Sequence, residues 1–149
     1  MAVVPRPGRV IVIEDEPRIR ELVSAVVGIV NMDSSAYENG QDAVDGISEH
    51  FQELDGVAPD IAVILSDIQM PVLDGPSAVE EIIGLYGQHY NGSYLPEIKF
   101  MSGQYTPEQG KQVSTLTDHP ILEKPVNVSD IKKNLTEAQE AFYQRVNSD

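Results

Sequence analysis

The feature that most constrains the fold is an uninterrupted run of β-branched apolar residues, Val10–Ile13, that stops abruptly at the acidic segment Glu14–Pro17. A run without polar alternation predicts a strand that is buried on both faces, as in a parallel sheet. Proline and acidic side chains suit the first turn of a helix, so a helix is predicted directly afterwards, over residues 17–30. A doubly covered strand followed at once by a helix indicates an α/β fold.

The same strand-then-helix pattern occurs five times along the chain. The alternation predicts a (βα)5 fold, a doubly wound, five-stranded parallel sheet with helices on both faces and right-handed crossovers. The connections at about residues 52–59 and 87–96 are longer than is typical, and no sequence pattern accounts for them. Strands are predicted at about residues 9–13, 32–37, 61–65, 98–101 and 120–122, and helices at about 17–30, 43–54, 79–86, 107–116 and 128–145.

The length of 149 residues fits one domain. Residues 1–8 contain two prolines and a glycine and are expected to be a disordered leader, residues 9–146 to form the domain, and residues 147–149 to be a tail. The chain ends shortly after its last predicted helix, which leaves no room for a DNA-binding or enzymatic output domain. We therefore expect a single-domain protein, or a domain excised from a larger one.

Composition excludes several classes of protein. The net charge of −14 would repel phosphate backbones, so a direct nucleic-acid partner is not expected. The chain has no cysteine, which rules out disulfides, thiolate metal sites and cysteine nucleophiles. No apolar run approaches the roughly 20 residues that span a bilayer, and the first residues do not resemble a signal peptide. We expect no membrane insertion and a cytoplasmic location.

Five chemically useful side chains stand at the predicted carboxyl ends of four strands. In a parallel sheet these ends meet at one edge, where the sites of doubly wound folds lie. Three acids, a hydroxyl and an ammonium are therefore expected to face one crevice. They are Glu14 and Asp15 after the first strand, Asp67 after the third, Ser102 after the fourth and Lys124 after the fifth.

Clustered carboxylates repel one another, and a hard divalent cation removes that penalty. Oxygen ligands without a nearby histidine or cysteine favour Mg²⁺ or Mn²⁺ over zinc. One carboxylate can then act as a nucleophile towards a phosphoryl group and form an aspartyl phosphate. Lys124 and the metal would neutralise the phosphoryl oxygens, and the hydroxyl of Ser102 would donate a hydrogen bond to one of them.

With these residues in order, the sequence resembles the response regulator receiver domains of two-component phosphorelay signalling, the CheY-like superfamily. The resemblance covers about residues 9–146 and implies a flavodoxin-like sheet with strand order 2-1-3-4-5. Each motif is modest evidence by itself, but all of them occur in order and at the correct strand ends. They are V-I-V-I-E-D-E-P (10–17), Y-E-N-G-Q-D-A-V (37–44), S-D-I-Q-M-P-V-L-D-G (66–75), M-S-G (101–103) and E-K-P (123–125).

The resemblance implies a role for each matching residue. Asp67 matches the phosphoacceptor, Ser102 the switch residue and Lys124 the invariant lysine, whose bond to Pro125 is expected to be cis. The family's metal ligands match Asp15, Asp67 and the backbone carbonyl of Gln69. Glu14 replaces the commoner aspartate, and we expect its longer side chain to reach the metal through a water molecule.

The function that the resemblance implies is signalling rather than turnover of a substrate. A histidine kinase or a histidine phosphotransfer protein would supply the phosphoryl group to Asp67, and the modified surface would bind a downstream protein target. The only catalysis expected is self-catalysed phosphorylation and dephosphorylation. One departure concerns output: the aromatic switch residue of the family is replaced by Ile121, so a ring rotation cannot carry the signal.

Three other functions compete with this one. A receiver-like docking scaffold would keep the fold without phosphorylation. A Mg²⁺-dependent phosphohydrolase that forms an aspartyl phosphate would need a second aspartate two residues after the nucleophile, where this chain has Gln69. A flavodoxin-like cofactor binder would need a phosphate-binding loop after the first strand, where the acidic residues Glu14–Glu16 would repel a phosphate.

Overall fold

The computed structural model describes residues 7–147 and confirms the predicted alternation of strands and helices. All paired strands are parallel, and their order is β2-β1-β3-β4-β5, as expected for a flavodoxin-like sheet. In chain order the elements are β1 (Arg9–Ile13), α1 (Pro17–Ile29), β2 (Asp33–Tyr37), α2 (Gly40–Leu54), β3 (Ile61–Asp67), α3 (Gly75–Tyr90), β4 (Glu97–Ser102), α4 (Pro107–Leu116), β5 (Leu122–Glu123) and α5 (Val128–Asn147).

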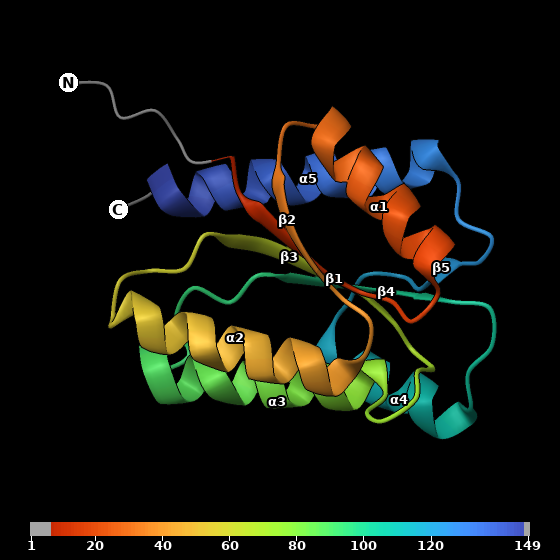
Figure 1. Cartoon of the computed structure of the whole chain (residues 1–149), viewed down its shortest axis with the longest axis horizontal. Coiled ribbons are helices and arrows are strands. Elements are labelled where there is room, and N and C mark those ends of the chain that lie inside the picture. Colours follow the sequence, from red (N-terminus) through yellow and green to blue (C-terminus); the bar gives the residue numbers. More distant parts are fainter. Residues whose placement is uncertain (1–6, 148–149) are drawn as a thin grey trace.

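The sheet lies between two layers of helices, with α1 and α5 on one face and α2, α3 and α4 on the other (Figure 1). Alternate residues of β1 therefore enter different cores. Val10 and Val12 pack in the cluster beneath α1 and α5, and Ile11 and Ile13 pack in the cluster beneath α2 and α3. This double burial is the reason why β1 shows no polar alternation.

Helix α3 is longer than predicted. It begins after Asp74, whose side chain accepts a hydrogen bond from the backbone nitrogen of Ser77, and it ends at Tyr90 rather than at residue 86. Its last turns are held by aromatic packing, because the ring of Phe51 lies 4.9 Å from that of Tyr86 and 5.1 Å from that of Tyr90. The long connection expected at 87–96 is therefore helical as far as residue 90.

The two long connections meet at the end of the sheet opposite the acidic strand ends. The hydroxyl of Tyr90, in the last turn of α3, donates a 2.7 Å hydrogen bond to the carbonyl of Val57, between α2 and β3. The end of α3 is thus hydrogen-bonded to the connection between α2 and β3. This contact was not foreseen because it depends on the extra helical turn.

Helices α3 and α4 differ in how many of their residues are buried in the core. Helix α3 buries seven residues, whereas α4 buries only Val113 among its ten residues, all of which the structure describes. Strand β5 pairs with β4 only through Leu122 and Glu123, two residues later than the predicted start of this strand. The face of the sheet that α4 covers is therefore only weakly packed near β4 and β5.

The chain ends depart from the expected leader and tail. Pro7 and Gly8 were expected to be disordered, but their carbonyls accept hydrogen bonds from the side chain of Gln139 and the backbone nitrogen of Asp33. Helix α5 includes Asn147, the first residue of the expected tail. The rest of the expected leader and tail lies outside the described residues. Within residues 7–147, no helix combines the length and apolarity needed to cross a membrane.

Candidate functional site

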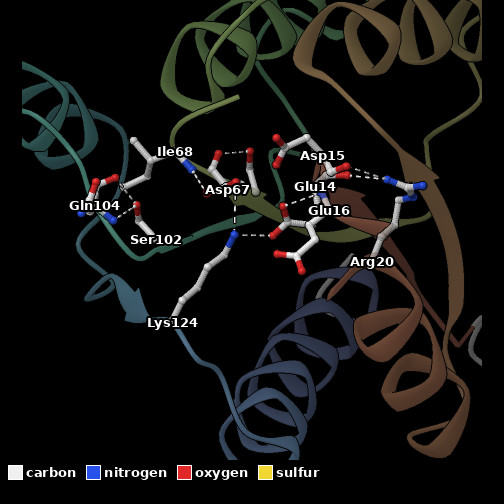
Figure 2. A network of polar contacts seen from close by, with 10 residues as sticks. Glu14, Asp15, Glu16, Arg20, Asp67, Ile68, Ser102, Gln104 and Lys124 are labelled. Atoms are coloured by element: carbon white, nitrogen blue, oxygen red, sulfur yellow. Dashed lines mark hydrogen bonds and ion pairs between the residues drawn. The ribbon is translucent and has the colours of Figure 1, made fainter. Parts of the chain in front are cut away.

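The carboxyl ends of β1, β3, β4 and β5 meet at one edge of the sheet, as predicted (Figure 2). The register pairs Ile13 with Ser66, so the next residues along the two strands, Glu14 and Asp67, stand side by side. Ser102 pairs with Glu123 in the same way, which brings Lys124 to the site. The structure therefore gathers side chains from residue 14 to residue 124 around one point.

Three carboxylates form the acidic part of this site. One oxygen each of Glu14, Asp15 and Asp67 lies within 4.8 Å of the other two. Glu14 is completely buried and Asp67 is 5% exposed, whereas Asp15 is exposed to solvent. Hard oxygen ligands that are open to water on one side fit Mg²⁺, which keeps part of its hydration shell.

The ammonium of Lys124 lies between two of these carboxylates (Figure 2). Its Nζ is 2.6 Å from Oε1 of Glu14 and 3.2 Å from Oδ2 of Asp67. The backbone nitrogen of Lys124 donates to the carbonyl of Ser102, and the bond between Lys124 and Pro125 is cis, as expected. One cation thus partly neutralises the two buried acids.

Burial and mutual repulsion shift the acid–base behaviour of the cluster. Burial raises the pKa of Glu14 to about 7, although the contact with Lys124 opposes this effect. Burial likewise raises the pKa of Asp67, and the charge of Lys124 again opposes it. For Lys124, burial favours the neutral amine, but the contacts with Glu14 and Asp67 outweigh it and raise the pKa. The metal-free site therefore holds protons more tightly than separate carboxylates would.

The backbone around Asp67 is held closely. The amide of Ile68 donates a 2.8 Å hydrogen bond to Oδ1 of Asp67, and the hydroxyl of Ser66 donates to the carbonyl of Asp67 at 2.8 Å. Gly75, at the start of α3, lies so near that a Cβ there would be 1.8 Å from this carbonyl oxygen. The sequence did not predict this close approach.

Two of the predicted site residues are hydrogen-bonded to other segments rather than to Asp67. The hydroxyl of Ser102 donates a 2.6 Å hydrogen bond to the carbonyl of Gln104 and accepts one from the backbone nitrogen of the same residue. Gln69 lies on the exposed loop after β3, and its side chain donates to the side chain of Gln109. The expected role of the Gln69 carbonyl as a metal ligand therefore stays a prediction.

Sequence reasoning missed two residues that support the site. Arg20, on α1, donates a 2.8 Å hydrogen bond to the backbone carbonyl of Glu14. Gln109, on α4, bonds to Gln69 across 40 positions of sequence. No spacing rule connects either residue to the acidic cluster, because both contacts depend on how the helices pack.

The match of this sequence to a protein family agrees with the geometry of the site. Residues 10–136 match the family described as the response regulator receiver domain, so the chain belongs to this family. No curated protein matches the sequence. Members of the family are signalling phosphoacceptors of two-component systems, and the fold and acidic cluster described above agree with that class.

Solved structures of receiver domains share the fold at low sequence identity. The chemotaxis protein CheY4 of Vibrio cholerae is 20% identical, with a TM-score of 0.65 over 88% of this chain and 98% of that chain. A receiver domain protein from Clostridium thermocellum is 17% identical, with a TM-score of 0.70 over 90% and 95%. The receiver domain of the hybrid histidine kinase CckA is 20% identical, with a TM-score of 0.62 over 89% and 99%.

Proposed function

We propose that this protein is a phosphoacceptor whose Asp67 takes a phosphoryl group from a histidine kinase or a histidine phosphotransfer protein. The observation that carries the proposal is the position of Lys124, whose ammonium lies 3.2 Å from Oδ2 of Asp67 inside a cluster of acids. A lysine so placed can accompany the charge of an incoming phosphoryl group.

In the proposed reaction, a carboxylate oxygen of Asp67 attacks the phosphorus of a phosphohistidine. A new O–P bond forms, the P–N bond breaks, and the imidazole nitrogen keeps the electron pair and takes a proton. Asp67 is well placed for this step because the amide of Ile68 fixes one of its oxygens while Lys124 contacts the other. Lys124 would then pair with a phosphoryl oxygen instead of the carboxylate.

Mg²⁺, or Mn²⁺ in its place, would neutralise the phosphoryl oxygens when bound. Asp15 and Asp67 would be its carboxylate ligands, the carbonyl of Gln69 a third ligand, and Glu14 would act through a water molecule. The fit rests on the chemistry of the donors: three converging carboxylates, one of them open to solvent, in a chain without cysteine.

Phosphorylation would change the surface of the protein through Ser102. To donate to a phosphoryl oxygen, its hydroxyl must give up the 2.6 Å hydrogen bond to the carbonyl of Gln104 and so release the loop before α4. Ile121 is half-buried and packs against the core beneath α2 and α3. We propose that a backbone shift of this loop and of α4 signals to a downstream protein partner, in the cytoplasm and without direct contact to nucleic acid.

Intact mass spectrometry tests the proposal directly. The protein is incubated with acetyl phosphate or phosphoramidate, with and without Mg²⁺. The expected result is one Mg²⁺-dependent phosphoryl adduct that is absent from Asp67→Asn, whose amide is not a nucleophile. A matched control is Asp33→Asn, an exposed acid on β2, which should be phosphorylated as the parent is.

Two other outcomes would replace the proposal. A folded protein that takes no phosphoryl group under any of these conditions would favour the docking scaffold. Release of many phosphate molecules per protein from an unrelated phosphate ester would favour the phosphohydrolase. A stable adduct on Asp67→Asn would contradict the assignment of Asp67.

A further inference from the structure

An apolar hollow of about 280 Å³ lies at the end of the sheet opposite the acidic site. Its walls come from the connection between α2 and β3, the start of β3, the connection between α3 and β4, and the last turns of α5, which gather at one end of the molecule (Figure 1). The two long connections that no sequence pattern explained therefore build one cavity. Together with Arg145, the residues that line it are Ala58, Pro59, Ile61, Tyr94, Phe142 and Val146.

Contacts within the protein hold the walls of this hollow in place. The hydroxyl of Tyr90 donates a 2.7 Å hydrogen bond to the carbonyl of Val57, which precedes the lining residue Ala58. The ring of Tyr90 also meets that of Tyr94 edge to face, with 5.6 Å between the ring centroids. A cavity whose walls are already ordered binds a ligand at a lower entropic cost than one that must be assembled.

Tyr94 has an uncommon backbone conformation beside this hollow. Its φ is 67°, in the left-handed region that bulky residues rarely adopt. Residues in such conformations are concentrated at sites that hold ligands, where the backbone places a side chain that an ordinary conformation would not. The residue is 51% exposed and lines the hollow, so part of its surface is available to a bound molecule.

Arg145 is the only charged residue among the described residues that line the hollow. Its guanidinium donates to the carbonyl of Leu95 and lies 5.6 Å from the centroid of the Phe142 ring, so its position is fixed by the protein. Burial lowers the pKa of Arg145, although Tyr86 and Glu97 oppose this effect. A guanidinium that has lost part of its hydration is stabilised by an anion, and its planar set of N–H donors matches a carboxylate.

We propose that this hollow is a binding site for a small organic monocarboxylate, whose charged end pairs with Arg145 and whose apolar body packs against Ile61 and Tyr94. The carboxylate would add to the existing contacts of Arg145 without replacing them. The inference does not depend on Asp67, and it gives the protein a second ligand site, at the opposite end of the sheet from the first.

Charge and volume together select this class of ligand. One cation on an apolar wall matches one negative charge, whereas a phosphate or a polyanion would leave further charge against apolar side chains. Asp60, next to Pro59, pairs with Arg9 at 3.3 Å, so its charge is already compensated. The volume lies near the lower end of the range of ligand pockets, which leaves room for about ten to fifteen non-hydrogen atoms.

Calorimetric titration with three probes at constant ionic strength tests the proposal. Phenylacetate carries both the charge and the apolar body, and we expect it to bind with a Kd on the order of 0.1–1 mM. Its neutral analogue 2-phenylethanol should bind about tenfold more weakly, because it lacks the ion pair with Arg145. Acetate lacks the apolar body and should not bind measurably. In NMR spectra, phenylacetate should shift the amide signals of Tyr94 and Val146 and leave that of Asp67 unchanged.

Two variants with matched controls locate the site. Ala58→Leu fills the hollow without removing a polar group and should abolish binding of phenylacetate, whereas Ala25→Leu, at an exposed position on α1, should leave it intact. Arg145→Gln should weaken binding of phenylacetate about tenfold and leave that of 2-phenylethanol unchanged. Arg18→Gln removes the same charge from an exposed position on α1 and should change neither affinity.

Several results would overturn the inference. Equal affinities of the parent for phenylacetate and 2-phenylethanol would show that Arg145 does not recognise the charge. Binding that survives Ala58→Leu would place the ligand elsewhere, and a folded parent that binds no phenylacetate at concentrations well above the expected Kd would have no such site. A dimer in sedimentation that Val146→Asp dissociates would assign the hollow to a second copy of the chain. None of these results bears on phosphorylation of Asp67, which is measured separately by mass.

Discussion

The ammonium nitrogen of Lys124 lies closer to Glu14, at 2.6 Å, than to Asp67, at 3.2 Å. Glu14 has no exposed surface, so ionisation of this carboxyl inside the protein depends on a neighbouring cation. In the unmodified protein the lysine therefore stabilises the fold as well as the phosphoacceptor.

Replacing this lysine should destabilise the protein. Lys124→Met leaves a buried carboxyl without its ion pair, which costs on the order of 3 kcal/mol in the free energy of unfolding. The loss should be smaller when Glu14→Gln is present as well, because Asp67 is then the only one of the two buried carboxyls left without its partner. Urea unfolding of the parent, the two single variants and the double variant measures this coupling. Strictly additive effects would contradict the ion pair.

The metal-free protein should lose stability as the pH rises. The pKa of Glu14 is about 7 in the folded protein and about 4.5 as an ordinary value, so the folded state holds this proton more tightly. Between these two pH values, deprotonation favours the unfolded chain, by on the order of 3 kcal/mol in total. Urea unfolding at pH 5 and pH 8 should show a smaller decline in Glu14→Gln. Adding Mg²⁺ should reduce the decline in the parent, because the cation stabilises ionised carboxylates.

Asp15 should contribute to metal affinity but little to stability. Asp15→Asn removes one charged ligand from the cluster, and we expect Mg²⁺ to bind about tenfold more weakly. Because the side chain is exposed, the free energy of unfolding in metal-free buffer should hardly change. Glu16→Gln removes a neighbouring charge outside the cluster and serves as the control. Equal affinities of the parent and Asp15→Asn in calorimetric titration would exclude Asp15 as a ligand.

Position 75 should not tolerate a side chain. A Cβ at Gly75 would lie 1.8 Å from the carbonyl oxygen of Asp67, which no side-chain rotation relieves. Gly75→Ala should therefore destabilise the fold by about 3 kcal/mol or more, beyond the common cost of overpacking. Gly84→Ala, in the same helix with nothing within 4 Å of the added atom, should stabilise it by about 0.5–1 kcal/mol. Thermal unfolding of both variants compares the two positions.

The fold could be predicted from the sequence where local patterns determine it. The apolar runs of β1 and β3 and the polar residues that end them were enough to place Glu14 and Asp67 at one edge. These features depend on strand burial and parallel topology, which leave a direct pattern in the chain. The match to the receiver family confirms the class of protein that this edge indicated.

Contacts between distant helices left no such pattern. Lys99 lies in a predicted strand and is 1% exposed, and its ammonium bonds to Asn134 at 2.9 Å and pairs with Glu137 at 3.8 Å on α5. A buried lysine is rare, and its partners follow only from how α5 crosses the sheet. The pairing of Gln109, on α4, with Gln69 was unpredictable for the same reason.

The weak packing of α4 against the core has a consequence for the timescale on which the protein can respond. Helix α4 is anchored in the core by Val113, while α3 buries seven residues. Local opening free energies follow buried contacts, so the amide protons of α4 should exchange with solvent through openings far less costly than global unfolding. Helix α4 can therefore detach and repack repeatedly while the sheet stays folded. A small change in free energy at the acidic site is then enough to shift the populations of its packed and detached states.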